Sequence, residues 1–287
     1  QRQMCIRDRG KSTLMNALVG EKLSIITSKA QTTRHRIMGI VSGEDFQIVY
    51  SDTPGILKPS YKLQESMMKF VTGALTDADV ILYVTDTVEQ SERSAEIVDS
   101  IRRSGIPTVV VINKIDLSTP EALEALVDKW QAEIPGAQVV PTSAKENFNI
   151  EGLFRTILSL LPEGPAFYPK DTLTDKTLRF FASEIIREKI LKFYDKEIPY
   201  CCEIEIESYK EEPTIDRISA TIYVARDSQK GILIGHKGEK LKRVGQTARE
   251  DMEQFLGKKV FLQLFVKVSD DWRNNERQLR RFGYEQE

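Results

Sequence analysis

The chain has 287 residues, of which 40% are hydrophobic and 29% are charged, and its formal net charge is -2. This length predicts two domains, and the composition excludes a disordered or fibrous protein. No run of about 18 or more apolar residues is present, so we expect no transmembrane helix. No apolar stretch follows the N-terminal arginines, so we expect no secretory signal and a cytoplasmic location.

The first half of the chain alternates short apolar segments with amphipathic ones. We predict strands over 46–52, 80–86, 107–114 and 137–143, and helices over 12–20, 94–105 and 150–162. Runs of Val and Ile between helices indicate a mostly parallel sheet with helices on both faces. Ligands of such α/β sheets bind beyond the carboxyl ends of the strands.

A proline-rich stretch divides the chain. We predict a first domain over 1–164, a linker over 165–175 and a second domain over 176–287. The second domain follows the order helix, two strands, two helices and strand, which predicts a compact α+β fold. These elements are expected over 175–198, 201–209, 217–225, 228–235, 239–257 and 260–268.

The first predicted helix opens with the end of a phosphate-binding loop. Gly10, Lys11, Ser12 and Thr13 stand at its N-terminus, where backbone N–H groups bind phosphate oxygens. We expect Lys11 to reach the β- and γ-phosphates and Ser12 to hold Mg²⁺. Taken alone, this pattern is explained as well by a helix N-terminus with a solvent-exposed lysine.

A second phosphate motif follows the strand predicted over 46–52. Its residues are Asp52, Thr53, Pro54 and Gly55. We expect Asp52 to reach Mg²⁺ through water and the Gly55 N–H to sense the γ-phosphate. A simple turn is the alternative, since Pro and Gly favour one.

A polar segment, 27–40, lies between these two motifs, and we expect its part 27–37 to respond to the nucleotide. We predict that it becomes ordered when Thr33 reaches the metal on the γ-phosphate, with Thr32 as the alternate ligand. Lys11, Thr33 and Gly55 are therefore predicted to act in catalysis, and Ser12, Thr33 and Asp52 to bind the metal. The residue after Gly55 is Ile56, which cannot orient an attacking water, so slow intrinsic hydrolysis is expected.

Two motifs after later strands predict guanine selectivity. Asp116 would accept hydrogen bonds from the two donors on the guanine edge, while Asn113 and Lys114 brace the base. Adenine lacks this donor pair and would leave the carboxylate unpaired. Ala144 would offer its backbone N–H to the guanine oxygen, with Ser143 and Lys145 alongside.

The second half contains a Gly-x-x-Gly loop between two predicted helices, formed by Gly235, His236, Lys237 and Gly238. Such a loop lets a single-stranded nucleic-acid backbone approach closely. Between positions 226 and 249, seven Lys and Arg stand against two acids, and we include Lys240, Lys242 and Arg243 in the predicted RNA site. A lone Gly-x-x-Gly is usually only a turn, but here the element order and the charge agree with RNA binding.

Two further features of the second half have simpler readings. Glu203, Glu205 and Glu207 alternate on one predicted strand and are expected to form a solvated face. The basic segment 272–284 either caps the domain or adds phosphate contacts, and both readings stay open.

With these motifs in order, the chain resembles the Era family of bacterial GTPases, which carry a C-terminal type II KH domain. The resemblance runs from Gly10 almost to the C-terminus, and includes "KAQTTRHRI", "FFASEIIREKI", "IGHKGEKLKRVG" and "ERQLRRFGY". It implies GTP or GDP and Mg²⁺ as cofactors, and a role in assembly of the small (30S) ribosomal subunit and maturation of 16S rRNA. It also implies that the KH domain binds the 3′ end of that RNA, that the protein is a monomer, and that it contacts the inner face of the membrane peripherally.

The opening residues depart from the family, whose members resemble "GRPNVGKS" after an apolar strand. Cys5, Arg7, Asp8 and Arg9 replace glycine, proline, asparagine and a small apolar residue. The asparagine can bind K⁺ in related GTPases, so K⁺ as a cofactor is left open. One account is a nucleotide-independent RNA-binding protein with a defective first domain. The other, favoured by the intact later motifs, is that residues 1 to about 9 replace the native strand and loop.

Overall fold

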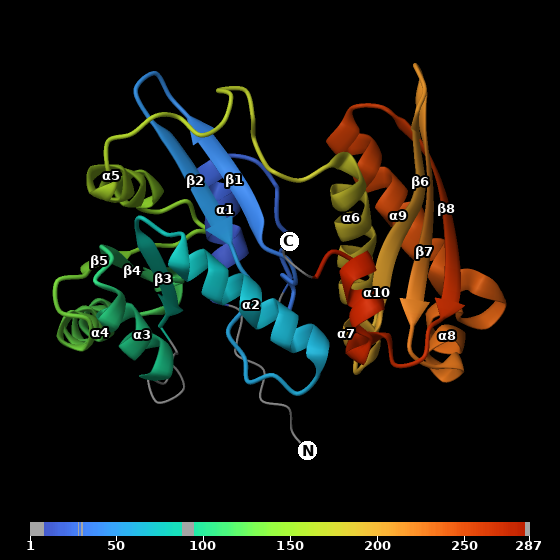
Figure 1. Cartoon of the computed structure of the whole chain (residues 1–287), viewed down its shortest axis with the longest axis horizontal. Coiled ribbons are helices and arrows are strands. Elements are labelled where there is room, and N and C mark those ends of the chain that lie inside the picture. Colours follow the sequence, from blue (N-terminus) through green and yellow to red (C-terminus); the bar gives the residue numbers. More distant parts are fainter. Residues whose placement is uncertain (1–8, 28, 30, 88–94, 285–287) are drawn as a thin grey trace.

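The computed structural model describes residues 9–27, 29, 31–87 and 95–284. Two bodies stand side by side in Figure 1, an N-terminal one around strands β1–β5 and a C-terminal one around β6–β8. Helix α2 crosses the space between them and extends toward α7 and α10.

The N-terminal body alternates strands and helices as the sequence predicts. Strands β3, β4 and β5 form a parallel sheet, while β1 and β2 form an antiparallel hairpin. All four predicted strands are present, whereas β1, α2 and α4 were not predicted. The elements are α1 (Lys11–Val19), β1 (Ile37–Ser42), β2 (Gln47–Asp52), α2 (Lys62–Thr76), β3 (Ile81–Asp86), α3 (Ala95–Ser104), β4 (Thr108–Asn113), α4 (Pro120–Glu133), β5 (Gln138–Pro141) and α5 (Ile150–Leu160).

The central strand of the parallel sheet is β4, and every residue of it is buried. Its Val and Ile side chains alternate between two hydrophobic clusters, one containing Val109 and Val111 and the other Val110 and Ile112. Burial on both faces is what a continuous apolar run in a parallel sheet indicates. The strand therefore brings its polar last residue, Asn113, to a fixed place at the carboxyl edge of the sheet.

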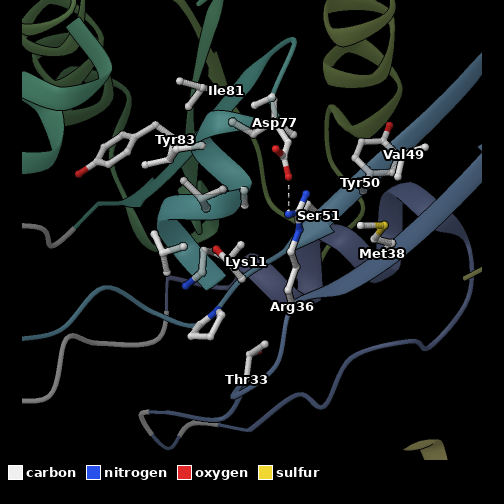
Figure 2. Close-up of a pocket in the computed structure, with 18 of the residues that line it drawn as sticks. Lys11, Thr33, Arg36, Met38, Val49, Tyr50, Ser51, Asp77, Ile81 and Tyr83 are labelled. Carbon is white, nitrogen blue, oxygen red and sulfur yellow. Dashed lines mark hydrogen bonds and ion pairs between the residues drawn. The ribbon is translucent and has the colours of Figure 1, made fainter. Parts of the chain in front are cut away.

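A cavity of about 560 Å³ separates the hairpin from the parallel sheet. Among the described strands, β2 pairs only with β1, and β3 pairs with β4 alone. Figure 2 shows Val49 and Tyr50 on the hairpin side and Ile81 and Tyr83 on the other, with Lys11 also among the lining residues. The predicted replacement of the native strand and loop concerns Cys5, Arg7 and Asp8, which lie outside the described residues.

The connection between the two bodies packs along the hairpin. The Ile40 N–H donates to the Leu173 carbonyl at 2.8 Å, and Gln47 accepts hydrogen bonds from the N–H groups of Phe167 and Tyr168, each at 2.9 Å. The predicted linker, 165–175, lies within the connection between the end of α5 and the start of α6. The predicted domain limits at 164 and 176 stay predictions.

The C-terminal body has the predicted order of elements, with the short helical elements α7, η3, η4 and α10 added. Its sheet has the order β6-β7-β8, antiparallel between β6 and β7 and parallel between β7 and β8. The strand predicted from 201 starts two residues later, because Pro199 lies in the helical turn α7. The elements are α6 (Leu178–Phe193), α7 (Ile198–Cys201), β6 (Glu203–Glu211), β7 (Ile215–Val224), α8 (Asp227–Ile234), η3 (His236–Gly238), α9 (Glu239–Leu256), β8 (Lys259–Val268), η4 (Trp272–Asn274) and α10 (Glu276–Arg281).

The predicted solvated face on β6 is wrong at its first residue. Glu203 is only 6% exposed because Arg34 and Tyr284 donate hydrogen bonds to its carboxylate. The Arg281 guanidinium contacts both oxygens of Glu205, at 2.7 and 2.6 Å. The basic C-terminal segment thus packs on β6 and caps the domain, which was one of its two predicted roles.

A small apolar cluster joins the two bodies. From α2 come Leu63, Met67 and Phe70, and they pack with Trp272 and Tyr284. Helix α2 follows the Asp52–Gly55 motif in the chain, so the second phosphate motif leads directly into this contact.

Candidate nucleotide and nucleic-acid sites

The first turn of α1 begins at Gly10, which has a left-handed backbone with a φ of 79°. A β-carbon at this position would lie 2.4 Å from Nδ2 of Asn113, so only glycine fits here. The first turn contains no acidic residue, and its N–H groups favour an anion. Thr13 lies in the same turn.

The three predicted metal ligands meet beside this helix. The Ser12 hydroxyl donates to Oδ2 of Asp52 at 2.8 Å and lies 2.9 Å from the Thr33 hydroxyl. Thr33 and Asp52 are buried, at 8% and 5% exposure. Hydroxyl and carboxylate oxygens are the ligands that Mg²⁺ takes, so the set fits this ion.

Burial and neighbouring groups act on the Asp52 carboxyl in opposite directions. Burial raises the pKa of the Asp52 carboxyl, while Lys11 and the hydrogen bond from Ser12 oppose that rise. The structure also distinguishes the two threonines of the 27–37 segment. The Thr32 hydroxyl donates to the Lys29 carbonyl at 2.5 Å, so Thr33 is the one that points to the metal ligands.

Lys11 and the second phosphate motif share one end of the cavity. A β-carbon on Gly55 would lie 3.8 Å from the Lys11 ammonium, and Thr53, Pro54 and Ile56 line the same space. The arrangement places a cation and the Gly55 backbone at the end of the site where a γ-phosphate is predicted.

Asn113 braces the phosphate loop against the guanine motif. Its Nδ2 donates to the Arg9 carbonyl and its Oδ1 accepts from the Ala144 N–H, both at 3.0 Å. The predicted donor to the guanine oxygen is therefore already bonded to Asn113, so a base would have to share or displace this bond. Sequence reasoning did not anticipate the contact.

Asp116 is exposed at the sheet edge, and its Oδ1 accepts from the Ser143 hydroxyl at 2.6 Å. Ser143 thus orients the carboxylate predicted to select guanine. Lys145 is 79% exposed and pairs with Glu146 at 2.8 Å, which raises the Lys145 pKa through that hydrogen bond. Its side chain is directed to its neighbour rather than to Asp116.

Two site residues were missed from the sequence or not given a role. Asp86 ends β3, is buried, and pairs with Lys114 at 3.4 Å. Its place as the acidic last residue of the strand predicted over 80–86 was a usable sequence signal. Arg9 lies with its guanidinium 5.6 Å from the Tyr83 ring centre and donates to the Tyr83 hydroxyl at 3.3 Å.

The Gly-x-x-Gly loop joins α8 to α9 as predicted. Gly235 and Gly238 both have positive φ angles, 73° and 80°, and Lys237 between them has 49°. The tight turn leaves Lys237 exposed together with His236, Lys240, Lys242 and Arg243. The structure therefore places the predicted RNA residues on one loop and the first turns of α9.

Two aromatic residues lie beside this basic surface and were not singled out from the sequence: Phe193 is partly exposed, whereas Tyr194 is buried beneath the surface. The Arg243 guanidinium lies 4.3 Å from the Phe193 ring centre, and the Lys240 ammonium lies 5.9 Å from that of Tyr194. Both rings come from the end of α6. A positive surface with aromatic rings beside it is typical of sites for single-stranded nucleic acid.

Comparison with known protein families identifies both halves of the chain. Residues 7–114 match the family described as "50S ribosome-binding GTPase", and residues 197–273 match the KH domain family. The chain is 44% identical over 279 residues to the GTPase Era of Alkaliphilus metalliredigens, covering 96% of this chain and 95% of that protein. It is 43% identical over 277 residues to the GTPase Era of Staphylococcus haemolyticus, covering 96% and 93%.

Two solved structures match over almost the whole chain. Era in complex with MgGDPNP and nucleotides 1506–1542 of 16S ribosomal RNA has a TM-score of 0.94 and 39% identity, covering 98% of this chain and 97% of that chain. A variant of Aquifex aeolicus Era bound to GDP and AlF4⁻ also has a TM-score of 0.94, with 40% identity and coverage of 98% and 96%. The predicted fold class, a GTPase domain followed by a KH domain, is confirmed.

Proposed function

The chain belongs to the Era family of GTPases, and from this we propose that it is a GTP-hydrolysing, RNA-binding switch protein. Its KH domain binds the 3′ end of the small-subunit rRNA, and the protein acts in assembly of the 30S subunit and maturation of 16S rRNA. Two relatives of the same fold support the two ligands, one bound to MgGDPNP and rRNA and one to GDP.

The observation that supports nucleotide binding best is the meeting of Ser12, Thr33 and Asp52. These residues come from a helix start, a loop and a strand end, and their oxygens lie within hydrogen-bond distance. Such convergence of hard ligands at a helix N-terminus suits a magnesium-bound phosphate chain. When bound there, Mg²⁺ neutralises charge on the β- and γ-phosphates.

Several residues of the chain are assigned separate roles in hydrolysis. Lys11 would stabilise charge on the γ-phosphate, the Gly55 N–H would bind a γ-phosphate oxygen, and the Thr33 hydroxyl would hold the metal together with Ser12 and Asp52. Ile56 lines the same space and has no group to orient water. We therefore propose slow intrinsic hydrolysis that an added partner or a monovalent cation such as K⁺ accelerates.

Guanine selectivity is tested by base preference. The variant D116N replaces the acceptor with an amide that donates to the extra carbonyl of xanthine. We expect it to bind xanthosine triphosphate more tightly than GTP, whereas D128N, an exposed acid on α4, retains GTP preference. Binding of fluorescent nucleotides with Mg²⁺ measures both, and GTP preference in D116N contradicts the assignment of Asp116.

RNA binding is tested at the Gly-x-x-Gly loop. The change Gly238→Asp places a carboxylate where a phosphate is expected, next to a backbone angle that favours glycine. We expect weaker binding of single-stranded RNA and unchanged nucleotide binding. The matched control is G257D, which changes a glycine of similar φ, 63°, at the other end of α9. Equal RNA affinity of both variants contradicts the predicted clamp.

A nucleotide-independent RNA-binding protein is the alternative function. Arg9 favours it, because its side chain stands beside Tyr83 where relatives are expected to have a small apolar residue. Magnesium-dependent binding of GTP by the full chain supports the GTPase. Full RNA binding without any nucleotide binding supports the alternative.

We also propose a cytoplasmic, monomeric protein that contacts the inner face of the membrane peripherally. This proposal rests on the family resemblance alone. In the described part of the chain, no helix has both the length and the apolar character needed to cross a membrane.

A further inference from the structure

The C-terminal domain contacts the α1–β1 loop on both sides of Thr33. The Arg187 guanidinium, on α6, donates to the Thr32 carbonyl and to the Glu184 carboxylate. One residue beyond Thr33, the Arg34 guanidinium enters the start of β6. Thr33 itself points the other way, to Ser12 at 2.9 Å.

Arg34 is almost completely enclosed by the C-terminal domain, with 1% exposure. It donates to the carbonyls of Cys202 and Pro199 at 2.8 and 3.1 Å and to the Glu203 carboxylate at 3.0 Å. Burial by itself opposes the charge, but the Glu203 carboxylate helps to offset this, and the pKa of Arg34 is raised. The Arg34 Nε has no hydrogen-bond partner in the described part of the chain, but its two terminal nitrogens make three hydrogen bonds. Separating a buried guanidinium from such partners is strongly disfavoured.

A second layer fixes these partners. The Tyr284 hydroxyl donates to Oε2 of Glu203 at 2.6 Å, and its ring stacks on His35 at 4.3 Å between centres. Phe180 also contacts His35, edge-on and at 5.6 Å between ring centres. The loop is therefore held by residues of α6, β6 and the C-terminal segment together.

Neither the nucleotide motifs nor the Gly-x-x-Gly loop accounts for these contacts. With the backbone of Thr32 and the side chain of Arg34 both fixed, the intervening residue has little freedom. Thr33 is then held at the position from which its hydroxyl meets Ser12 and Asp52.

We propose that Arg187 and Glu203 are positioning residues of the nucleotide site, supplied by the RNA-binding domain. They hold Thr33 at the metal ligands only while the two domains are docked. This inference rests on the proposed GTPase function. Because coupling is reciprocal, binding of the magnesium-bound triphosphate and docking of the C-terminal domain favour each other.

The test compares triphosphate with diphosphate. Thr33 is predicted to serve only the γ-phosphate end, so R187Q and E203Q should weaken binding of a non-hydrolysable GTP analogue about tenfold, the effect of one lost hydrogen bond to a charged group. GDP affinity should stay the same. The control E276Q breaks the Lys62–Glu276 ion pair, an interdomain contact away from the loop, and should change neither affinity.

A double-mutant cycle separates positioning from general damage. In a Thr33→Ala background, R187Q should have no further effect on analogue affinity, because the hydroxyl that Arg187 is proposed to position is already absent. Equal losses for GDP and the analogue, or an undiminished effect of R187Q in the Thr33→Ala chain, would overturn the proposal.

Hydrogen exchange tests the same idea without nucleotide. Amides of 31–37 should exchange faster in R187Q than in the parent chain, while those of α1 stay protected. Unchanged exchange in the loop refutes the positioning role. Failure of the parent chain to bind any guanine nucleotide counts instead against the proposed GTPase function, and hydrogen exchange then decides the positioning role by itself.

Discussion

Replacing Gly10 or Gly20, the glycines at the two ends of α1, with alanine should lower the free energy of unfolding by different amounts. Gly10 and Gly20 flank this helix with nearly equal φ angles, 79° and 81°. A left-handed backbone costs an alanine about 1–2 kcal/mol at either position. The surroundings differ, because a β-carbon on Gly20 would meet nothing within 4 Å, whereas one on Gly10 would lie 2.4 Å from Asn113.

The clash at Gly10 must displace a bonded amide. Asn113 is 2% exposed, and it joins Arg9 to Ala144 by two hydrogen bonds of 3.0 Å. Leaving such buried groups without partners adds about 1–3 kcal/mol. We therefore expect G10A to cost roughly 2–5 kcal/mol and G20A about 1–2 kcal/mol.

Urea unfolding followed by circular dichroism measures both variants against the parent chain. Equal destabilisation by G10A and G20A would refute the reasoning, because backbone strain, which both sites share, would then explain the whole effect without a clash at Asn113. Loss of nucleotide affinity is expected in G10A alone, since Asn113 also braces the base.

Three further predictions concern the loop and the cavity. Burial lowers the pKa of His35 to about 4; the nearby Arg187 lowers the pKa further, whereas the Glu203 carboxylate raises it. The unfolded chain takes up the proton below about pH 6.5, so stability falls between pH 6.5 and 4 by up to about 1.4 kcal/mol per pH unit, and H35F should flatten this slope in urea unfolding. Asn16→Ala removes the acceptor for the N–H groups of Leu23 and Ser24, and should cost about 1–3 kcal/mol by urea unfolding; a smaller loss means that water replaces the bonds. Replacing residues 1–9 with an apolar strand and Gly-Arg-Pro-Asn-Val should raise the melting temperature by more than about 5 °C and tighten GTP binding, because the strand can pair with β2 and β3 and fill the cavity. An unchanged melting temperature contradicts that placement.

The strands and motifs that were predicted share a local cause. In β4, an unbroken run of Val and Ile signals burial on both faces, and the polar residue that ends the run marks the sheet edge. In the same way, Asp52 was predicted as the polar residue that ends the strand over 46–52, which is β2 in the structure. These features need only neighbours in the sequence, so pattern and period reveal them.

The features that were missed depend on distant partners. Glu203 alternates with other acids and looks solvent-exposed, but its partner Arg34 is 169 residues away. Likewise, the Ala144 N–H meets Asn113 across 31 residues. Strand β1 was missed although its sequence, IMGIVS, is largely apolar, because its first residues were assigned to the polar segment 27–40. Pairing with β2 then fixes its place in the fold.

Three of the four stretches that carried the family resemblance meet in one place. "KAQTTRHRI" supplies Arg34 and His35, "FFASEIIREKI" supplies Phe180 and Arg187, and "ERQLRRFGY" supplies Tyr284. A buried guanidinium or carboxylate has strict demands, since each lost partner leaves a charge unpaired in the interior. Such a contact restricts residue identity as strongly as a ligand site does. We infer that these stretches are distinctive because they join the nucleotide loop to the RNA-binding domain.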